Sequence, residues 1–290
     1  VLVLGADGGI GKYVCRELCL RGYKVRGLTR QAASSKGLDA DVEWVVGDLN
    51  KKADLAPAMK GVKKVIFAAG AHGFEDIENN RRIYSEAVAE IARLGKAEGT
   101  DRFLLISSAG MQLVNPLSDS FEDPPRLSKY LRDVLKWKLR GEQLLRNSGL
   151  PYTIIRAYSL NNNAADIAQN KDDTAIAILQ GEPKDVSGVI SRENLAQVTV
   201  EALLADTTQD VTFEVLDVRK SQNPDYPDWR KIIREDLNKT PPLSKQELSL
   251  MSRPPPLLLS TQEKAEEDAA TAAGGAKDRL TPLAIEFLEK

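Results

Sequence analysis

The chain has 290 residues, of which 42 % are hydrophobic and 28 % charged, and its formal net charge is −2. This length allows one large α/β domain with an appendage, or two small domains. The near-neutral balance argues against a dedicated nucleic-acid-binding protein, which would carry a strong basic excess. No apolar run approaches the roughly 20 residues that a membrane-spanning helix needs, so we expect no transmembrane segment.

Short β-rich runs alternate with helical stretches over the first two thirds of the chain. Strands separated by helices of this length form βαβ units with right-handed crossovers. The sequence therefore predicts an α/β fold with a doubly wound parallel sheet, the Rossmann fold. In chain order, the predicted strands are Val1–Leu4, Lys24–Leu28, Val42–Val46, Val62–Ala68, Arg102–Ser107 and Tyr152–Arg156, and the helices are Ile10–Arg21, Ala53–Lys60, Asn80–Glu98 and Arg126–Asn147.

A smaller group of elements follows the sixth strand. Short strands are predicted at Ala175–Leu179 and Val189–Ile190, then a helix at Glu193–Leu204 and a last strand at Val211–Val215. We expect these elements to build a small lobe on the substrate side of the sheet. Residues 1–218 are thus interpreted as a Rossmann domain with this lobe.

Residues 219–290 differ in composition and are interpreted as an extended, partly helical tail. Helices are predicted at Asp228–Asn238, Gln262–Ala273 and Pro282–Glu289, with proline and glycine interruptions between them. The proline-rich run that ends in Leu257–Leu259 suits either docking on a protein partner or packing on its own domain. The sequence does not decide between the two.

A glycine-rich turn joins the first strand to the first helix, with the spacing G-x-x-G-x-x-G. Glycines allow the tight turn and let the backbone approach a pyrophosphate, which the unpaired N–H groups of the helix N-terminus then bind. The strand–turn–helix context gives this otherwise weak motif its weight. The residues expected to bind the dinucleotide here are Gly5, Asp7, Gly8, Gly9, Ile10 and Gly11.

The end of the second strand indicates which dinucleotide is preferred. NAD sites place an acidic residue there to bind the ribose 2′-hydroxyl. This chain has Thr29 and Arg30 instead, with Arg26 on the strand itself. A guanidinium suits a 2′-phosphate through charge-assisted hydrogen bonds, so NADP(H) is favoured over NAD(H).

Five further stretches occur in the order seen in one known family. They are Gly47-Asp48-Leu49, Ala68-Ala69-Gly70, Arg102–Gly110, Gly141–Leu160 and Val189–Leu204. Over residues 1–216 the chain resembles the atypical, NmrA-like NAD(P)-binding branch of the short-chain dehydrogenases/reductases. The resemblance implies adenine contacts from Asp48 and Leu49, close approach of the dinucleotide to the sheet at Ala68, Ala69 and Gly70, and further cofactor contacts from Ser107 and Lys138.

The chain departs from this superfamily in its catalytic residues. Active members use Tyr-x-x-x-Lys on the long helix, in which the Lys lowers the pKa of the Tyr, and a Ser near the end of the fifth strand. Alignment puts Lys138 at the Lys position and Val134 at the Tyr position, while Tyr130 lies one helical turn too early. Ser107 and Ser108 remain, but Ala109 and Gly110 occupy the usual register of the Ser.

Two functions stay open. In the first, the Tyr-dependent chemistry is lost, and the protein is a cofactor-binding scaffold, regulator or assembly factor, as several NmrA-like and plastid proteins are. In the second, Lys138 acts alone as acid or base in an NADPH-dependent reductase of a small organic substrate. The first is slightly favoured by Val134. The sequence starts at Val1 without a methionine or a readable targeting segment, so this end does not indicate a location. The resemblance to plastid proteins is the basis for expecting a stromal protein.

Other polar residues have structural interpretations that compete with functional ones. Asn161, Asn162 and Asn163 follow the sixth strand, where they would line the substrate pocket or form a polar loop. Arg156 is expected to pair with an inner carboxylate, and Ser191 to cap a helix. No metal is expected: the single histidine, His72, and two cysteines one helical turn apart form no zinc-binding spacing.

Overall fold

The structure is a computed structural model that describes residues 1–31, 41–71, 77–111, 129–162, 173–181, 188–222, 225, 227–245 and 247–248. Predictions for His72, for Asn163 and for the tail beyond residue 248 lie outside the described residues. They include the helices at Gln262–Ala273 and Pro282–Glu289.

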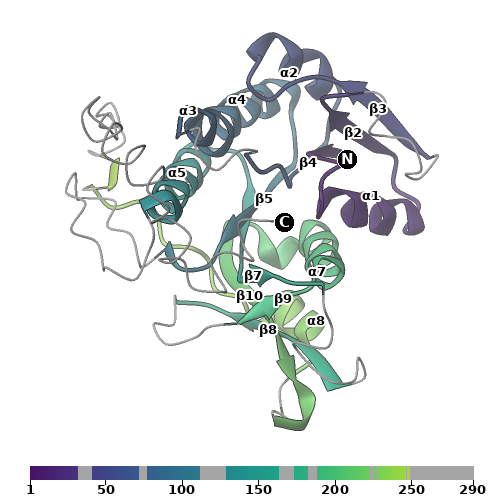
Figure 1. Cartoon of the computed structure of the whole chain (residues 1–290), viewed down its shortest axis with the longest axis vertical. Coiled ribbons are helices and arrows are strands. Elements are labelled where there is room, and N and C mark those ends of the chain that lie inside the picture. The colour runs from purple at the N-terminus through teal and green to yellow at the C-terminus, as the bar shows by residue number, and fades with distance from the viewer. Residues whose placement is uncertain are drawn as a thin grey trace, which may run out of the picture.

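An eight-stranded sheet in the order β3-β2-β1-β4-β5-β6-β10-β8 forms the centre of the described structure (Figure 1). Neighbouring strands are parallel except at the β10–β8 edge, where they are antiparallel. The predicted Rossmann fold is therefore confirmed. The strands are β1 (Leu2–Leu4), β2 (Val25–Thr29), β3 (Val42–Val46), β4 (Lys64–Phe67), β5 (Arg102–Ser108), β6 (Tyr152–Ala157), β8 (Thr174–Leu179) and β10 (Val211–Arg219).

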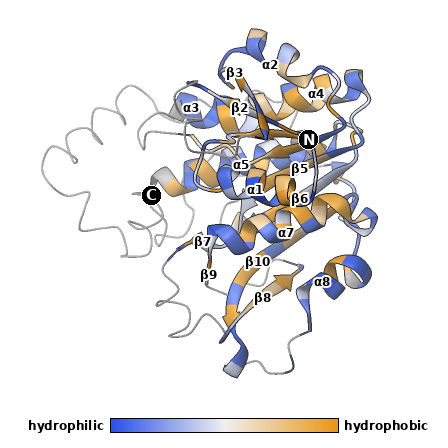
Figure 2. Cartoon of the chain, turned by 90° about the vertical axis from the view of Figure 1, so that its right-hand side faces the viewer, coloured by the Kyte–Doolittle hydropathy of each residue, from blue (hydrophilic) through white to orange (hydrophobic). Residues whose placement is uncertain are grey.

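Helices cover both faces of this sheet. Helices α1 (Gly11–Leu20) and α7 (Arg192–Leu204) pack on one face, and α2 (Lys52–Met59), α4 (Val88–Glu98) and α5 (Lys129–Arg146) pack on the other. Figure 2 shows hydrophobic residues along the strands and on the helices against them. Parallel strands buried on both faces carry continuous apolar runs, as β1 does with three fully buried residues.

The strand order reverses between β1 and β4. In open α/β sheets, ligands bind at the carboxyl ends of the strands at such a switch point. The turns that follow β1 and β4 meet there, and Ala68 N donates a hydrogen bond to Leu4 O at 3.0 Å. The fold thus places the glycine turn at the edge where a cofactor would bind.

The elements expected to form a substrate-side lobe are arranged differently. β10 pairs with β6, and β8 pairs with β10, so both extend the main sheet. A separate two-stranded sheet consists of β7 (Ser159–Leu160) and β9 (Val189–Ile190). The sequence predicted β9 but not β7. The positions of β8 and β10 depend on pairing between strands that are distant in the sequence. No local sequence pattern predicts such pairing.

The helix predicted at Asn80–Glu98 is interrupted. It consists of α3 (Ile77–Arg81), the π-helical turn η2 (Arg82–Ala87) and α4. η2 packs against α5 so closely that a Cβ on Gly141 would lie 1.9 Å from Tyr84 O. Short π-helical turns inside helices frequently occur at functional sites.

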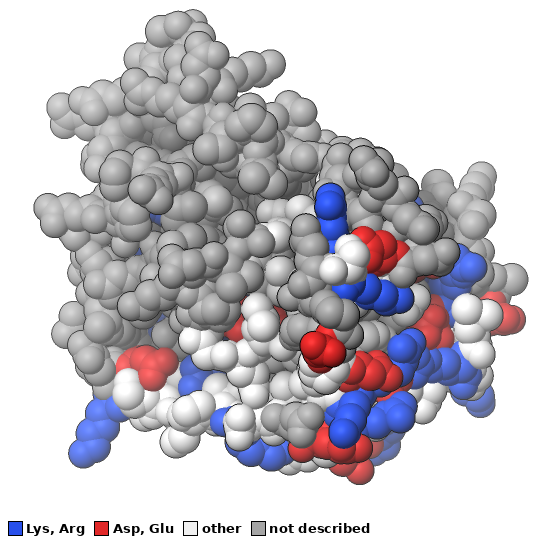
Figure 3. All heavy atoms as spheres, turned by 90° about the horizontal axis from the view of Figure 1, so that it is seen from below, with Lys and Arg blue, Asp and Glu red and all other residues white. Residues whose placement is uncertain are grey.

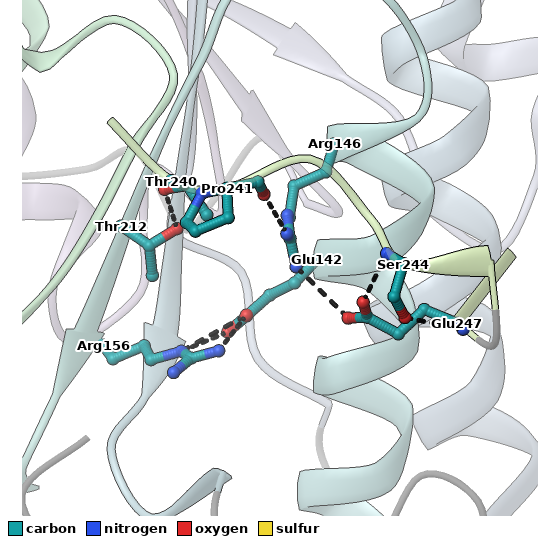
Figure 4. A network of polar contacts seen from close by, with 8 residues as sticks. All are labelled: Glu142, Arg146, Arg156, Thr212, Thr240, Pro241, Ser244 and Glu247. Carbon is teal, nitrogen blue, oxygen red and sulfur yellow. Dashed lines mark hydrogen bonds and ion pairs between the residues drawn. The ribbon is translucent and has the colours of Figure 1, made fainter. Parts of the chain in front are cut away.

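A buried arginine joins α5 to the sheet, as predicted for Arg156. Its guanidinium binds Glu142 on α5, with Nη2 2.8 Å from Oε2, and Nη1 lies 3.5 Å from Glu214 Oε1 on β10. All three residues are buried. Figure 4 shows the pair formed by Arg156 and Glu142. The one guanidinium is paired with both carboxylates, and pairing is the usual condition for burying charges.

The described part of the tail packs on its own domain. The chain continues through η6 (Lys220–Gln222), α8 (Trp229–Lys231) and η7 (Ile232–Asp236), where one longer helix was expected. Arg146 on α5 then donates to Pro241 O at 2.6 Å and lies 3.6 Å from Glu247, and Thr240 donates to Thr212 on β10 (Figure 4).

Surface charges of both signs are interspersed. Figure 3 shows Lys and Arg beside Asp and Glu over the described part of the lower face. Such mixing produces no extended field of one sign over the described part of that face. In the described ranges, no helix is both long and apolar enough to cross a membrane.

Candidate functional site

The glycine turn adopts a shape that side chains would prevent. Gly5 has φ +76°, and a Cβ there would lie 2.7 Å from Ala69 Cα. A Cβ on Gly11 would lie 2.0 Å from Gly5 O, while Gly8 N donates to that same oxygen at 3.0 Å. The turn is therefore a backbone cradle, and Ile10 precedes the first residue of α1.

Asp7 connects this turn to the end of β2. Its Oδ2 accepts a hydrogen bond from Thr29 Oγ1 at 2.8 Å. Arg30 follows directly and is exposed, at the carboxyl edge of the sheet. Arg26, at the opposite end of the strand, is occupied by Glu43 at 3.1 Å and by Ala58 O at 2.9 Å. Of the two arginines, Arg30 is the one at the carboxyl edge of the sheet.

The turns after β3 and β4 complete the expected dinucleotide side. Asp48 shapes its own turn, because Oδ1 accepts from Asn50 N at 3.0 Å. Leu49 packs against the apolar cluster under α2 and α4. Ala69 lies against Gly5, and Gly70 faces Tyr84, whose Oη would be 3.7 Å from a Cβ at this glycine.

Lys138 lies on the opposite face of the sheet, on α5. Its Nζ donates to Ser108 Oγ at 2.6 Å and lies 5.0 Å from the centre of the Tyr84 ring. Burial lowers the pKa of Lys138 to about 8, against the opposite influence of the Glu142 carboxylate. Ser107 Oγ is buried and bonds to no group in the described part of the chain. The lysine is thus held by a hydroxyl and an aromatic face, with no carboxylate bound to it by any described contact.

Val134 occupies the expected position one turn before Lys138 and is buried. It offers no proton, as the sequence indicated. The side chain of Tyr130 lies outside the described residues. No tyrosine therefore stands in the usual register on the described part of α5.

Tyr84 is a site residue that the sequence analysis missed. It sits in η2, and its Oη accepts a hydrogen bond from Ala71 N at 3.0 Å, beside the turn after β4. Burial raises the pKa of Tyr84, so the phenol keeps its proton. Nothing in the local pattern marks it, because its position depends on the π-helical turn against α5.

A buried carboxyl lies near this group. Asp133 Oδ2 accepts from Asn80 Nδ2 at 3.2 Å, and Asn80 Oδ1 has no donor among the described residues. Burial raises the pKa of Asp133 to about 6, while the hydrogen bond from Asn80 acts in the opposite direction. This carboxyl titrates close to neutrality.

The start of α7 also reaches the glycine turn. Ser191 caps the helix as predicted, its Oγ accepting from Asn194 N at 3.1 Å. Arg192, the first helical residue, is buried, and its Nε lies 2.9 Å from the position of a Cβ on Gly9. The sequence predicts only the cap here, and the contact of Arg192 with the turn was not predicted.

The groups at this edge fit a dinucleotide. The cradle of Gly5, Gly8 and Gly11 would be filled by any Cβ, and Arg192 brings a buried positive charge beside it. Among the described residues, no group of three His, Cys, Asp or Glu side chains could hold a metal ion.

Comparison with known proteins agrees with this geometry. The NAD(P)H-binding family matches residues 5–206. The chain is 30 % identical over 240 residues to an uncharacterized chloroplastic protein of Arabidopsis thaliana, covering 75 % of this chain and 68 % of that protein. It is 27 % identical over 248 residues to sanguinarine reductase of Eschscholzia californica, covering 74 % and 88 %.

A solved structure supports the fold. A candidate NAD-dependent epimerase/dehydratase from Bacillus halodurans superposes with a TM-score of 0.62 at 23 % identity, covering 77 % of this chain and 96 % of that one. Together with the family match, the glycine cradle and the sheet order assign the chain. It belongs to the NAD(P)H-binding family of atypical short-chain dehydrogenase/reductase-like Rossmann proteins.

Proposed function

We propose that this protein is an NADPH-dependent reductase of a small organic substrate, and that Lys138 donates the proton. One observation carries the proposal: the Lys138 ammonium is half-buried at the cofactor edge, 2.6 Å from Ser108 Oγ, and burial lowers its pKa to about 8. A general acid works best when its pKa lies near the operating pH. An ordinary surface lysine would hold its proton too tightly for this role.

The residues of the carboxyl edge would hold the cofactor. The glycine turn would bind the pyrophosphate, Asp48 and Leu49 the adenine, and Arg30 the 2′-phosphate. Ala68, Ala69, Gly70 and Ser107 would lie along the rest of the dinucleotide. When bound, the reduced dinucleotide supplies the hydride. The preference for NADPH over NADH depends on Arg30, whose exposed guanidinium stands where NAD enzymes place an acid.

Lys138 completes the reduction by supplying the proton. A substrate atom that gains negative charge as the hydride arrives takes a proton from Nζ, which leaves a neutral amine. Ser108 Oγ and the Tyr84 ring hold Nζ in place, and the ring face favours the charged amine before transfer. Water then returns the proton to the amine, so that hydride and proton together account for the two-electron reduction.

The test uses NADPH consumption with sanguinarine, the compound named for one relative, and with a panel of carbonyl acceptors. With any acceptor that is turned over, Lys138→Met should remove nearly all turnover and leave NADPH binding. Lys138→Arg is the matched control for charge, because a guanidinium does not release its proton near neutral pH. Unchanged turnover in Lys138→Met would exclude Lys138 as the acid.

A second candidate function is a cofactor-binding scaffold, regulator or assembly factor. Val134, buried at the usual Tyr position, favours it. Under this function, NADPH binds with the same dependence on the glycine turn, no acceptor is reduced, and a protein partner docks on the tail within 219–290. NADPH binding without consumption across the panel, together with capture of a defined partner that truncation after residue 248 abolishes, would favour this function. A plastid location is part of the same proposal, since the Arabidopsis relative is chloroplastic.

A further inference from the structure

Arg192 stands out among the buried cations of this protein. It is the first residue of α7, and only 7 % of it is exposed. Its Nε and Cδ lie 2.9 Å and 3.3 Å from the position that a Cβ would take on Gly9. The side chain therefore crosses from α7 to the glycine turn, and it fits there because residue 9 has no side chain.

The other buried arginines are bonded to acceptors. Arg156 binds Glu142 at 2.8 Å, and Arg102 donates to Thr208 Oγ1 at 3.0 Å and to Thr153 Oγ1 at 3.2 Å. The guanidinium of Arg192 has no hydrogen bond or ion pair to any residue of the described ranges. Burial lowers the pKa of Arg192, yet a guanidinium stays protonated in proteins. A largely buried charge is costly without a counter-charge, so an anionic ligand would be stabilised at this position.

The main chain around Arg192 is held from two sides. Asp217 on β10 accepts from Ser191 N and from Asn194 Nδ2, both at 2.9 Å. Asn162 Oδ1, from the loop after β7, accepts from Arg192 N at 3.3 Å. Such anchoring fixes where the side chain starts, which lowers the entropy lost when a ligand binds it.

Two helix N-termini meet at this point. α1 begins directly after the glycine turn, α7 begins at Arg192, and the two helices pack on the same face of the sheet. Each N-terminus directs the positive end of a helix dipole to this point, and α1 also offers its first main-chain N–H groups. At α7, the N–H groups of Arg192 and Asn194 already donate to side chains. The combination of the two helix N-termini with a guanidinium suits a ligand with two adjacent negative charges.

We propose that Arg192 binds the pyrophosphate of the dinucleotide from the α7 side, opposite the glycine turn. The proposal rests on dinucleotide binding, which both candidate functions share, and not on reduction. It makes α7 part of the cofactor site, and it gives Gly9 a specific role: residue 9 must leave room for the arginine.

The test compares NADPH with 2′-AMP, which lacks the pyrophosphate, by titration of Arg192→Met. Loss of charge-assisted hydrogen bonds should weaken NADPH binding by about 10- to 100-fold. Affinity for 2′-AMP should not change. The melting temperature without ligand should stay level or rise, because the variant removes an unpaired buried charge. Arg16→Met, which removes an exposed charge from α1, is the matched control and should bind NADPH as the wild type does.

Gly9→Ala gives a second, independent measurement if Arg192→Met does not fold. Its methyl group would displace the flexible guanidinium without touching the backbone of another element, so NADPH binding should weaken while 2′-AMP binding stays. NADPH affinity within about twofold of wild type in both variants would overturn the proposal. Equal losses for NADPH and 2′-AMP would also overturn it. Wild-type protein that binds neither compound would reject the dinucleotide site itself.

Discussion

The dinucleotide side and the proton-donating side of the site are built in different ways. The centre of the first is one continuous stretch, Gly5–Gly11, whose shape is set by backbone contacts such as Gly8 N to Gly5 O at 3.0 Å. The second brings together Lys138 from α5, Ser108 from the end of β5 and Tyr84 from η2.

The difference explains why the two sides tolerate change differently. We expect a backbone cradle to keep or lose its shape as a unit, because Gly8 and Gly11 both lie against Gly5 O. A site built from separate side chains can lack one of them. Here Val134 stands at the usual tyrosine position, and Lys138 is still held by Ser108 and Tyr84. The predictions below test this contrast.

Gly11→Ala should have the largest effect. The new Cβ would lie 2.0 Å from Gly5 O and 2.8 Å from Ala6 Cα, so the turn must open. We expect no measurable NADPH binding and a loss of about 1–3 kcal/mol in the free energy of unfolding. Gly22→Ala is the control: nothing lies within 4 Å of its Cβ, but φ is +77°, so it should cost about 1 kcal/mol of stability and leave NADPH binding unchanged. If Gly11→Ala binds NADPH normally, the cradle is not the dinucleotide site.

Lys138→Met should affect the other side alone. We expect kcat to fall by about 10²- to 10⁴-fold, with NADPH affinity changed far less. In the wild type, kcat should fall as the pH rises through about 8, because the ammonium must be protonated to donate. Equal losses of kcat and of NADPH affinity would mean that Lys138 belongs to the dinucleotide side instead.

Asp133→Asn should stabilise the protein at neutral pH. The pKa of Asp133 is raised from 3.8 to about 6, so the folded state disfavours its charge, and the wild type loses stability as the pH rises through that interval. The variant avoids this loss, and its amide can donate to Asn80 Oδ1, which has no donor among the described residues.

We expect Asp133→Asn to gain about 2 kcal/mol at pH 7 and nothing at pH 3, measured by urea unfolding. A gain that does not change with pH would show that Asp133 keeps an ordinary pKa. NADPH affinity should be unaffected, because the described hydrogen bond of Asp133 is with Asn80 and not with a residue proposed to hold the dinucleotide.

Arg30→Ala should have the smallest effect and should distinguish the two cofactors. The exposed guanidinium should contribute about 1 kcal/mol to a 2′-phosphate, so NADPH affinity should fall by about five- to tenfold. NADH affinity, measured in parallel, should not change. A similar loss for both cofactors would place Arg30 away from the 2′-phosphate.

The sequence predicted the fold well because the signals were local. β3 has the bounds that its apolar run indicated, and the glycine turn lies between the strand and helix expected for it. The N-cap at Ser191 and the buried pair of Arg156 were also predicted correctly. Each depends on residues whose type and immediate neighbours specify the structure.

The missed features depend on contacts between distant elements. β8 joins the main sheet only by pairing with β10, and the π-helical turn at Tyr84 is associated with packing against Gly141. Arg192 reaches Gly9 because α1 and α7 lie side by side. The one local signal for this contact was that Arg192 directly follows the Ser191 cap. The helix cap was enough to explain that pattern, so no contact with the turn was predicted.

The most direct test of the proposed chemistry is an NMR titration of the lysine Nζ groups, with the Lys138 signal assigned by its absence in Lys138→Arg. We expect this signal to titrate near pH 8, because burial at the cofactor edge lowers the pKa of Lys138 to about 8. Titration of Lys138 with the other lysines, near the ordinary value of about 10.4, would contradict its role as the proton donor.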